Sequence, residues 1–253
     1  MPSIYINEWP PYSPPDQARK ENSLVAARLM MNAALTAPFA GGIPQIEGHI
    51  LYGHDELEQL ARKMEELAYT LNNERTAHIY KYEAVMMRES DVVLFIGNYR
   101  AAQSPLDANC GLCGGPSGCG YVYGRRTVVA GQIDLTDRRC DTAVNGPLCS
   151  ARVNDLGYAV GSALWMATRL MVDCRPMMTV GVAGQKLGYC PNSMMVVGLP
   201  VATLSKNPYV DVGTQYHVIN MGQMVDAVRK TYTIARQFGP DYRKTIPPKV
   251  EEA

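Results

Sequence analysis

A stretch of twelve residues, NCGLCGGPSGCG (109–120), constrains this chain more than any other segment. It contains three cysteines, Cys110, Cys113 and Cys119, and five glycines. The Cys-x-x-Cys spacing of the first two is shared by zinc sites, iron–sulfur clusters, disulfides and thiol redox pairs. Hydrophobic periodicity is weak throughout residues 98–150, apart from a predicted strand within RTVVAGQIDL. Because so long a stretch without strong elements is unusual in a compact domain, we expect a bound metal centre to organise it.

The composition excludes several classes of protein. The 253 residues carry 24 basic and 24 acidic side chains, so no net charge attracts nucleic acid or an anionic membrane. No run of about 18 apolar residues predicts a transmembrane helix, and the N-terminus lacks the pattern of a signal peptide. We therefore expect a cytoplasmic protein without nucleic-acid or membrane partners. In a reducing compartment, a Cys-x-x-Cys motif is more typical of a metal or catalytic site than of a disulfide.

Helices and strands are expected to alternate on both sides of the cysteine-rich stretch. Residues 1–20 are predicted as an extended arm, and residues 21–253 as a single domain with an insertion at about 98–150. Periodicity and breaker residues predict helices at 22–37, 54–71, 76–88, 151–171 and 221–238, and strands at 45–53, 92–97, 178–182, 193–200 and 215–221. This alternation is typical of the α/β or α+β class.

The helix predicted at 151–171 is unusually thin on one side. Gly157 and Gly161 lie four residues apart, and small side chains follow at Ser162 and Ala163. Glycine inside a helix costs up to about 1 kcal/mol relative to alanine. We therefore expect something to approach this side closely. A second backbone is favoured over a flat cofactor.

Two longer stretches resemble the nitroreductase fold. AALTAPFAGGIPQ (33–45) is similar to its first helix and loop, and residues 154–200 are similar to its central helix and the strand that follows. With NCGLCG and GPLC (146–149) between them, the sequence resembles an uncharacterised family of proteins described as containing a ferredoxin domain. The resemblance implies a mixed sheet flanked by helices, often in an intertwined homodimer whose central helix lies at the interface.

The resemblance also implies a flavin site between subunits. The residues of this chain that match it are Ala37, Pro38, Gly41, Gly42, Gly157, Gly161 and Lys206. The Arg-x-Ser-x-Arg motif that holds the flavin phosphate in nitroreductases is absent. Lys206, within KNPYVD, is the remaining match for a phosphate contact.

The cysteine pattern further resembles the [4Fe–4S] modules of corrinoid iron–sulfur proteins and of membrane ferredoxin-oxidoreductase subunits. A cubane cluster presents four irons, each of which takes one thiolate. Cys110, Cys113 and Cys119 would supply three ligands, and the fourth is Cys149 or Cys140. The family's Gly-Pro-x-Cys motif favours Cys149. A zinc site is disfavoured because zinc ribbons use two Cys-x-x-Cys knuckles and this chain has one.

The remaining residues suggest no second chemistry. Cys174 and Cys190 lie in regular segments and are predicted to be small core residues. No nucleophile elbow, Walker loop or dinucleotide fingerprint follows a strand, so no catalytic residue is assigned. The sequence thus predicts a redox protein with one [4Fe–4S] cluster, with or without FMN. It would act in electron transfer or reduction and receive electrons from a ferredoxin or another donor. The alternatives are a non-enzymatic cluster-binding sensor or structural protein, and a zinc-stabilised scaffold.

Overall fold

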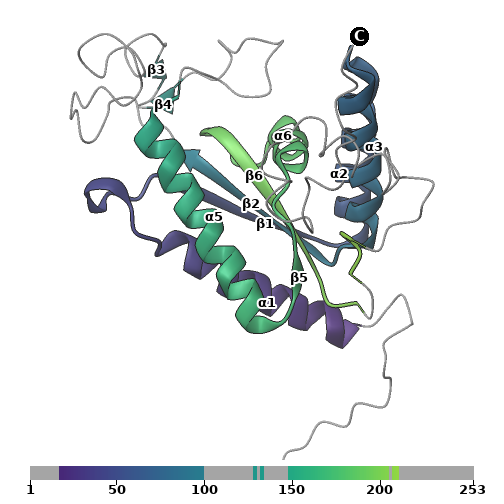
Figure 1. Cartoon of the computed structure of the whole chain (residues 1–253), viewed down its shortest axis with the longest axis horizontal. Coiled ribbons are helices and arrows are strands. Elements are labelled where there is room, and N and C mark those ends of the chain that lie inside the picture. The colour runs from purple at the N-terminus through teal and green to yellow at the C-terminus, as the bar shows by residue number, and fades with distance from the viewer. Residues whose placement is uncertain (1–16, 100–127, 130–131, 134–147, 205–206, 211–253) are drawn as a thin grey trace, which may run out of the picture. The chain divides into compact units, whose positions relative to one another are not determined.

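The computed structural model describes residues 17–99, 128–129, 132–133, 148–204 and 207–210, and every structural statement below concerns these ranges. They belong to one compact unit that ends at Val212. Its centre is a four-stranded sheet with helices on both faces, as Figure 1 shows. The predicted α/β class, with helices flanking a sheet, is therefore confirmed.

The elements follow one another in a simple order along the chain. The helices are α1 (Gln17–Leu35), the short 3-10 helix η1 (Ala40–Gly42), α2 (His54–Thr70), α3 (Glu74–Glu89), α5 (Ser150–Leu170) and α6 (Met178–Lys186). The strands are β1 (Ile46–Tyr52), β2 (Val92–Tyr99), β3 (Val128–Val129), β4 (Gln132–Ile133), β5 (Asp173–Cys174) and β6 (Ser193–Ala202). Strands β3 and β4 pair with each other as an antiparallel hairpin.

The sheet has the strand order β1-β2-β6-β5. Every described pairing in it is antiparallel, so a parallel member, which a mixed sheet requires, is not among the described residues. Strand β2 lies in the middle, and its residues Val92–Ile96 are at most 1% exposed. The continuous apolar run at 92–97 predicted this burial on both faces.

Helices α1 and α5 cover one face of the sheet and pack against each other (Figure 1). Alanines line the buried sides of both helices, so the two backbones can approach closely. The fully buried members are Ala27 and Ala34 of α1 and Ala159 and Ala163 of α5. Leu94 and Ile96 of β2 complete this core.

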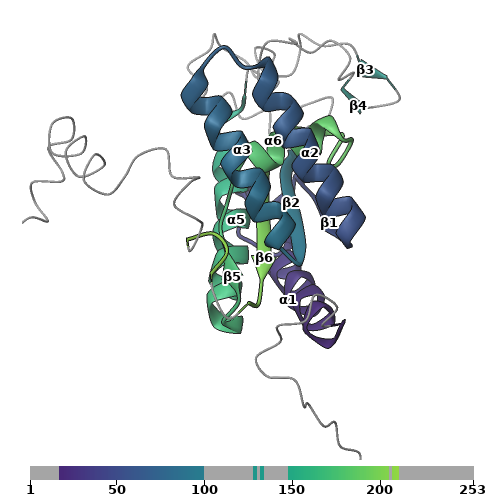
Figure 2. The ribbon, with the colours of Figure 1, turned by 90° about the vertical axis from the view of Figure 1, so that its right-hand side faces the viewer.

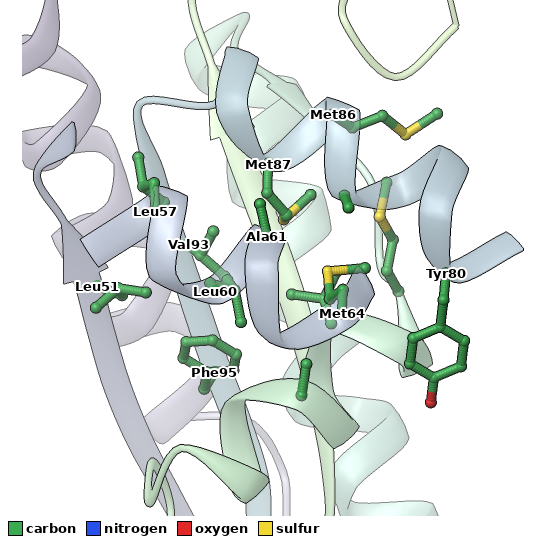
Figure 3. Close-up of a cluster of buried hydrophobic side chains, with 14 of the residues drawn as sticks. Leu51, Leu57, Leu60, Ala61, Met64, Tyr80, Met86, Met87, Val93 and Phe95 are labelled. Atoms are coloured by element: carbon green, nitrogen blue, oxygen red, sulfur yellow. The ribbon is translucent and has the colours of Figure 1, made fainter. Parts of the chain in front are cut away.

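Helices α2, α3 and α6 cover the other face, and Figure 2 shows α2 and α3 as a pair. Large side chains fill this second core, as Figure 3 shows for Leu60, Met64 and Phe95. A methyl group added at Gly184 of α6 would lie 2.2 Å from the Phe95 ring. The absence of a side chain at this position therefore lets α6 sit directly on the aromatic ring.

Two predictions about the elements are corrected by the structure. Met178–Val182 belongs to helix α6, although its alternating apolar residues predicted a strand. The arm predicted for residues 1–20 ends earlier, because α1 already begins at Gln17. The strand predicted at 215–221 and the helix predicted at 221–238 lie outside the described residues.

Candidate functional site

Cys149, the favoured fourth cluster ligand, stands at the start of α5. It is the N-cap residue, with φ −74° and ψ 119°, and its carbonyl oxygen accepts the first helical hydrogen bond from the Val153 N–H at 2.9 Å. Its thiol makes no capping hydrogen bond, and the residue as a whole is partly exposed. The helix thus fixes the Cys149 backbone without using its sulfur.

A buried ion pair lies one helical turn beyond Cys149. The Arg152 Nη1 donates to Asp155 Oδ2 at 2.7 Å, and the two side chains are 4% and 2% exposed. The same nitrogen donates to the Ile43 carbonyl oxygen at 3.0 Å, while Asp155 Oδ1 accepts from the Ala40 N–H at 2.9 Å. Together these bonds fix the loop that follows α1 to the first turn of α5.

The first turn of α5 is an electropositive environment. An α-helix carries a partial positive charge at its N-terminus, where anions are stabilised, and the first turn of α5 contains no acidic residue. The Nη2 of Arg152 is buried and has no hydrogen-bond partner among the described residues. An iron–sulfur cluster bound by thiolates is anionic. The residues around Cys149 therefore fit such a group.

The other predicted ligands cannot be placed beside Cys149. Cys110, Cys113, Cys119 and the alternative Cys140 all lie outside the described residues. Within the described ranges, no three His, Cys, Asp or Glu side chains come together as a metal site. The cluster assignment therefore stays a prediction. Of the four proposed ligands, Cys149 is the one that the structure describes, and its surroundings fit the assignment.

Cys174 and Cys190 behave as packed side chains. Cys190 is 2% exposed, and its Sγ lies 3.8 Å from the carbonyl oxygen of Phe95. Burial raises the pKa of each of the two thiols to about 12, so both stay protonated near neutral pH. Their packing among apolar side chains agrees with the predicted core role. Cys174 is partly exposed and packs against the core between the sheet and the helix pair α1 and α5.

A groove of about 810 Å³ runs between α1 and α5 on the side facing away from the sheet. We call it the α1–α5 groove. Its lining is apolar or uncharged throughout: Leu29, Asn32, Ala33, Thr36, Ala37, Pro38, Gly157, Tyr158, Gly161, Ser162, Trp165 and Met166. Apart from the adjacent residues and backbone of α5 itself, no described atom comes within 4 Å of the position that a Cβ would take at Gly157 or Gly161. The thin side of α5 therefore faces open space.

Four of the seven residues predicted for flavin meet in this groove, namely Ala37, Pro38, Gly157 and Gly161. Gly41 and Gly42 lie in the adjacent η1 turn, where both have φ 68° and so favour glycine. Lys206 lies outside the described residues. Residues 33–38 and 157–161, far apart in sequence, thus lie side by side in the structure.

The groove fits the ring system of a flavin better than its phosphate. Its uncharged walls and the missing side chains at Gly157 and Gly161 suit a flat aromatic ring. None of its lining residues is basic, so the described residues offer no cation to a phosphate there. A flavin phosphate would need a partner from elsewhere, and Lys206 is the predicted one.

Residues 145–212 match the family described as "Uncharacterized protein containing a ferredoxin domain (DUF2148)". An uncharacterized protein from Archaeoglobus fulgidus is 32% identical over 193 residues, which are 76% of this chain and 93% of that protein. The chain belongs to this ferredoxin-domain family. The match includes Cys149 and the whole of α5, so the family's recognisable core contains the start of α5 described above.

Solved structures similar to this ferredoxin-domain protein come from nitroreductases and flavin oxidoreductases. A putative NADH dehydrogenase/NAD(P)H nitroreductase from Bacteroides thetaiotaomicron covers 78% of this chain and 84% of its own, with 10% identity and a TM-score of 0.40. The NADPH:FMN oxidoreductase from Vibrio harveyi covers 87% of this chain and 86% of its own, with 11% identity and the same TM-score. The likeness concerns the arrangement of elements and carries no statement about activity.

Sequence reasoning missed the ion pair of Arg152 and Asp155. Two opposite charges three residues apart on a helix are ordinarily a solvent-exposed pair. The signal that could have found them is their position within an apolar stripe directly after Gly-Pro-x-Cys. It also missed Tyr158 and Trp165, which line the groove and are 46% and 57% exposed.

Among the described residues, no helix is both long and apolar enough to cross a membrane.

Proposed function

We propose that this protein is an iron–sulfur redox protein with one [4Fe–4S] cluster held by Cys110, Cys113, Cys119 and Cys149. The observation that supports the proposal most is the environment of Cys149. A partly exposed cysteine without a capping hydrogen bond stands at a helix N-terminus, three residues before a buried guanidinium whose Nη2 has no partner among the described residues. Membership of the ferredoxin-domain family points the same way. When bound, the cluster supplies a one-electron carrier.

The role of the chain's own residues follows from their placement. Cys149 is held rigidly because its carbonyl oxygen begins the α5 ladder. Arg152 and Asp155 anchor the first turns of the helix to the Ala40–Ile43 loop, close to the ligand. A rigid ligand environment reduces the reorganisation needed when an electron is gained or lost. We assign electron transfer or reduction, with a ferredoxin-like donor, to this centre.

A homodimer formed through the α1–α5 groove completes the proposal. Apolar side chains around the groove are exposed in the single chain: Val25 at 52%, Leu29 at 43%, Tyr158 at 46% and Trp165 at 57%. A contiguous apolar surface of this kind typically marks an interaction site. FMN would lie in the same groove, between the subunits, near Ala37, Pro38, Gly157 and Gly161. A cytoplasmic location agrees with a need for reduced thiols.

One anaerobic preparation tests the proposal against its alternatives. Iron, acid-labile sulfide, zinc and flavin are measured on the same sample of the full chain. We expect about four iron and four sulfide per chain and a broad absorption band. Zinc without sulfide would support a zinc-stabilised scaffold and refute the cluster. Iron and sulfide without flavin, in a protein that passes no electrons to a dye acceptor, would support a cluster-binding sensor or structural protein.

A further inference from the structure

Arg152 has one donor nitrogen for which the described fold supplies no acceptor. Its Nη1 is engaged by the Ile43 carbonyl oxygen and by Asp155, whereas its buried Nη2 has no partner among the described residues. The side chain is only 4% exposed, so bulk water does not compensate. Leaving a buried donor unsatisfied costs about 1–3 kcal/mol, and more when the group is charged. This nitrogen therefore points to an acceptor that binds near the start of α5.

The position of Arg152 narrows the choice of acceptor. It lies three residues after Cys149, in the positive first turn of α5, where a cation is unfavourable unless anions surround it. Both carboxylate oxygens of Asp155 already accept hydrogen bonds, Oδ1 from the Ala40 N–H and Oδ2 from Arg152 Nη1. Arg152 is also absent from the lining of the α1–α5 groove, so a ligand in that groove does not provide the acceptor. The proposed function supplies a candidate close by in sequence, namely an anionic group attached at Cys149 three residues earlier.

We propose that Arg152 Nη2 donates a hydrogen bond to a sulfur of the cluster ligated by Cys149, and that this bond raises the cluster's reduction potential. The inference rests on the proposed function. Reduction adds negative charge to the cluster, and a donor aimed at a sulfur stabilises that charge. Asp155 acts as a positioning residue, because its carboxylate and the Ile43 carbonyl oxygen fix the guanidinium plane.

A pair of matched variants isolates the hydrogen bond from the ion pair. Asp155→Asn keeps an oxygen for the Ala40 N–H and keeps Arg152, while removing one negative charge. Arg152→Met combined with Asp155→Asn removes the guanidinium as well, so the net charge equals that of the wild type. The two variants differ only at position 152. Midpoint potentials are measured anaerobically by redox titration followed by electron paramagnetic resonance, with iron per chain and circular dichroism as checks.

The double variant should have a lower midpoint potential than the wild type. We expect at least a tenfold smaller ratio of reduced to oxidised cluster at a fixed ambient potential, which corresponds to 59 mV for one electron. Asp155→Asn alone should leave the potential unchanged or raise it. If the double variant does not fold, Arg152→Lys keeps the charge but loses the second nitrogen, and should lower the potential with iron retained.

Several results would overturn the inference. Equal potentials in the wild type and the double variant would show that Nη2 does not serve the cluster. An equal fall in both variants, or loss of iron in both, would trace the effect to Asp155 and show that the Arg152 guanidinium adds nothing to the cluster's potential. Loss of flavin at unchanged potential would assign it to a phosphate. Wild-type protein without iron is a different failure, because it refutes the proposed function before any variant is compared, and the inference falls with it.

Discussion

Gly181 of α6 and Gly161 of α5 lie on opposite faces of the same sheet, and an added methyl group would meet very different surroundings. At Gly181 the new carbon would lie 1.9 Å from the backbone oxygen of Val196, whereas at Gly161 no described atom beyond the adjacent part of α5 lies within 4 Å. The first glycine lets a helix press against strand β6. Gly161 leaves the outer side of α5 without a side chain at this position.

The difference separates two uses of the same residue. On the α2, α3 and α6 face, glycine permits close packing within the chain and has a structural explanation. On the α1 and α5 face, the described chain gives no internal reason for two helical glycines, and exposed apolar side chains surround them. Because glycine destabilises a helix relative to alanine, glycines that face open space indicate that a partner packs against them. We therefore propose that a partner covers the α1–α5 groove.

Gly181→Ala should produce the largest effect. Backbone atoms of β6 occupy the space required, so α6 must shift or the strand must distort. Overpacking of this kind destabilises by about 3 kcal/mol. The free energy of unfolding in urea measures it, with Gly161→Ala as the control. Equal stability of Gly181→Ala and the wild type would show that the close approach of α6 and β6 is not required.

Trp165→Ala should weaken the proposed homodimer rather than the fold. The indole is 57% exposed, and the Arg169 guanidinium lies 4.7 Å from its ring centroid. Removing a central aromatic anchor from an interface costs about 2 kcal/mol or more, while an exposed substitution changes unfolding by only about 0.5 kcal/mol. Sedimentation equilibrium gives the dissociation constant. An unchanged dissociation constant would show that neither Trp165 nor the groove around it belongs to the interface.

Gly161→Ala should have opposite effects on the single chain and on the dimer. Alanine is the better helix former, so the unfolding free energy of the dilute single chain should rise by up to about 1 kcal/mol. The methyl group also occupies the groove and should weaken whatever packs there. Unfolding at low protein concentration and sedimentation at high concentration separate the two. Tighter association of the variant would contradict a close-packed partner at this position.

Arg88→Gln should have the smallest effect and should depend on pH. Hydrogen bonds from Arg88 and Arg62 lower the pKa of Glu58 from its ordinary value of 4.5 to about 2. The stabilisation from this ionised carboxylate is complete above pH 4.5 and is lost as the pH falls towards 2. Because the pair is at the surface, we expect a difference of under about 1 kcal/mol at pH 7.

Urea unfolding of wild type and Arg88→Gln at pH 7, 4 and 2.5 checks this dependence. The difference in stability should shrink at each step towards acid. Arg88 also donates to Glu65 Oε1 at 2.6 Å, so a difference that grows as the pH falls would mean that Arg88 acts through something other than the ionised carboxylates of Glu58 and Glu65.

Much of the fold could be read from periodic patterns. The continuous apolar run at 92–97 predicted strand β2, and the apolar stripe of Leu57, Leu60 and Met64 predicted helix α2. Both predictions are confirmed because the residues of each pattern are the ones that are buried. Helix α6 could not be read this way. Its valines alternate as in a strand, and what decides the helix is contact of Gly181 and Gly184 with distant residues. No local pattern contains that information.

The candidate site divides in the same way. Cys149 and the glycines of α5 stand out in the sequence because their residue types are unusual for their positions. The pair of Arg152 and Asp155 does not, since its burial depends on a loop that precedes it by more than a hundred residues: the separations are 109 for Ile43 and 115 for Ala40. A tertiary contact turns an ordinary helical ion pair into a fixed one beside the predicted ligand.

The most direct test of the central claim is the iron content of two cysteine variants. Cys149→Ala and Cys140→Ala are purified anaerobically in parallel with the wild type, and iron and sulfide per chain are determined. We expect Cys140→Ala to retain the wild-type content of about four iron, and Cys149→Ala to lose iron and its visible absorption. Full iron and sulfide in Cys149→Ala would contradict the assignment of the α5 N-terminus as the redox centre.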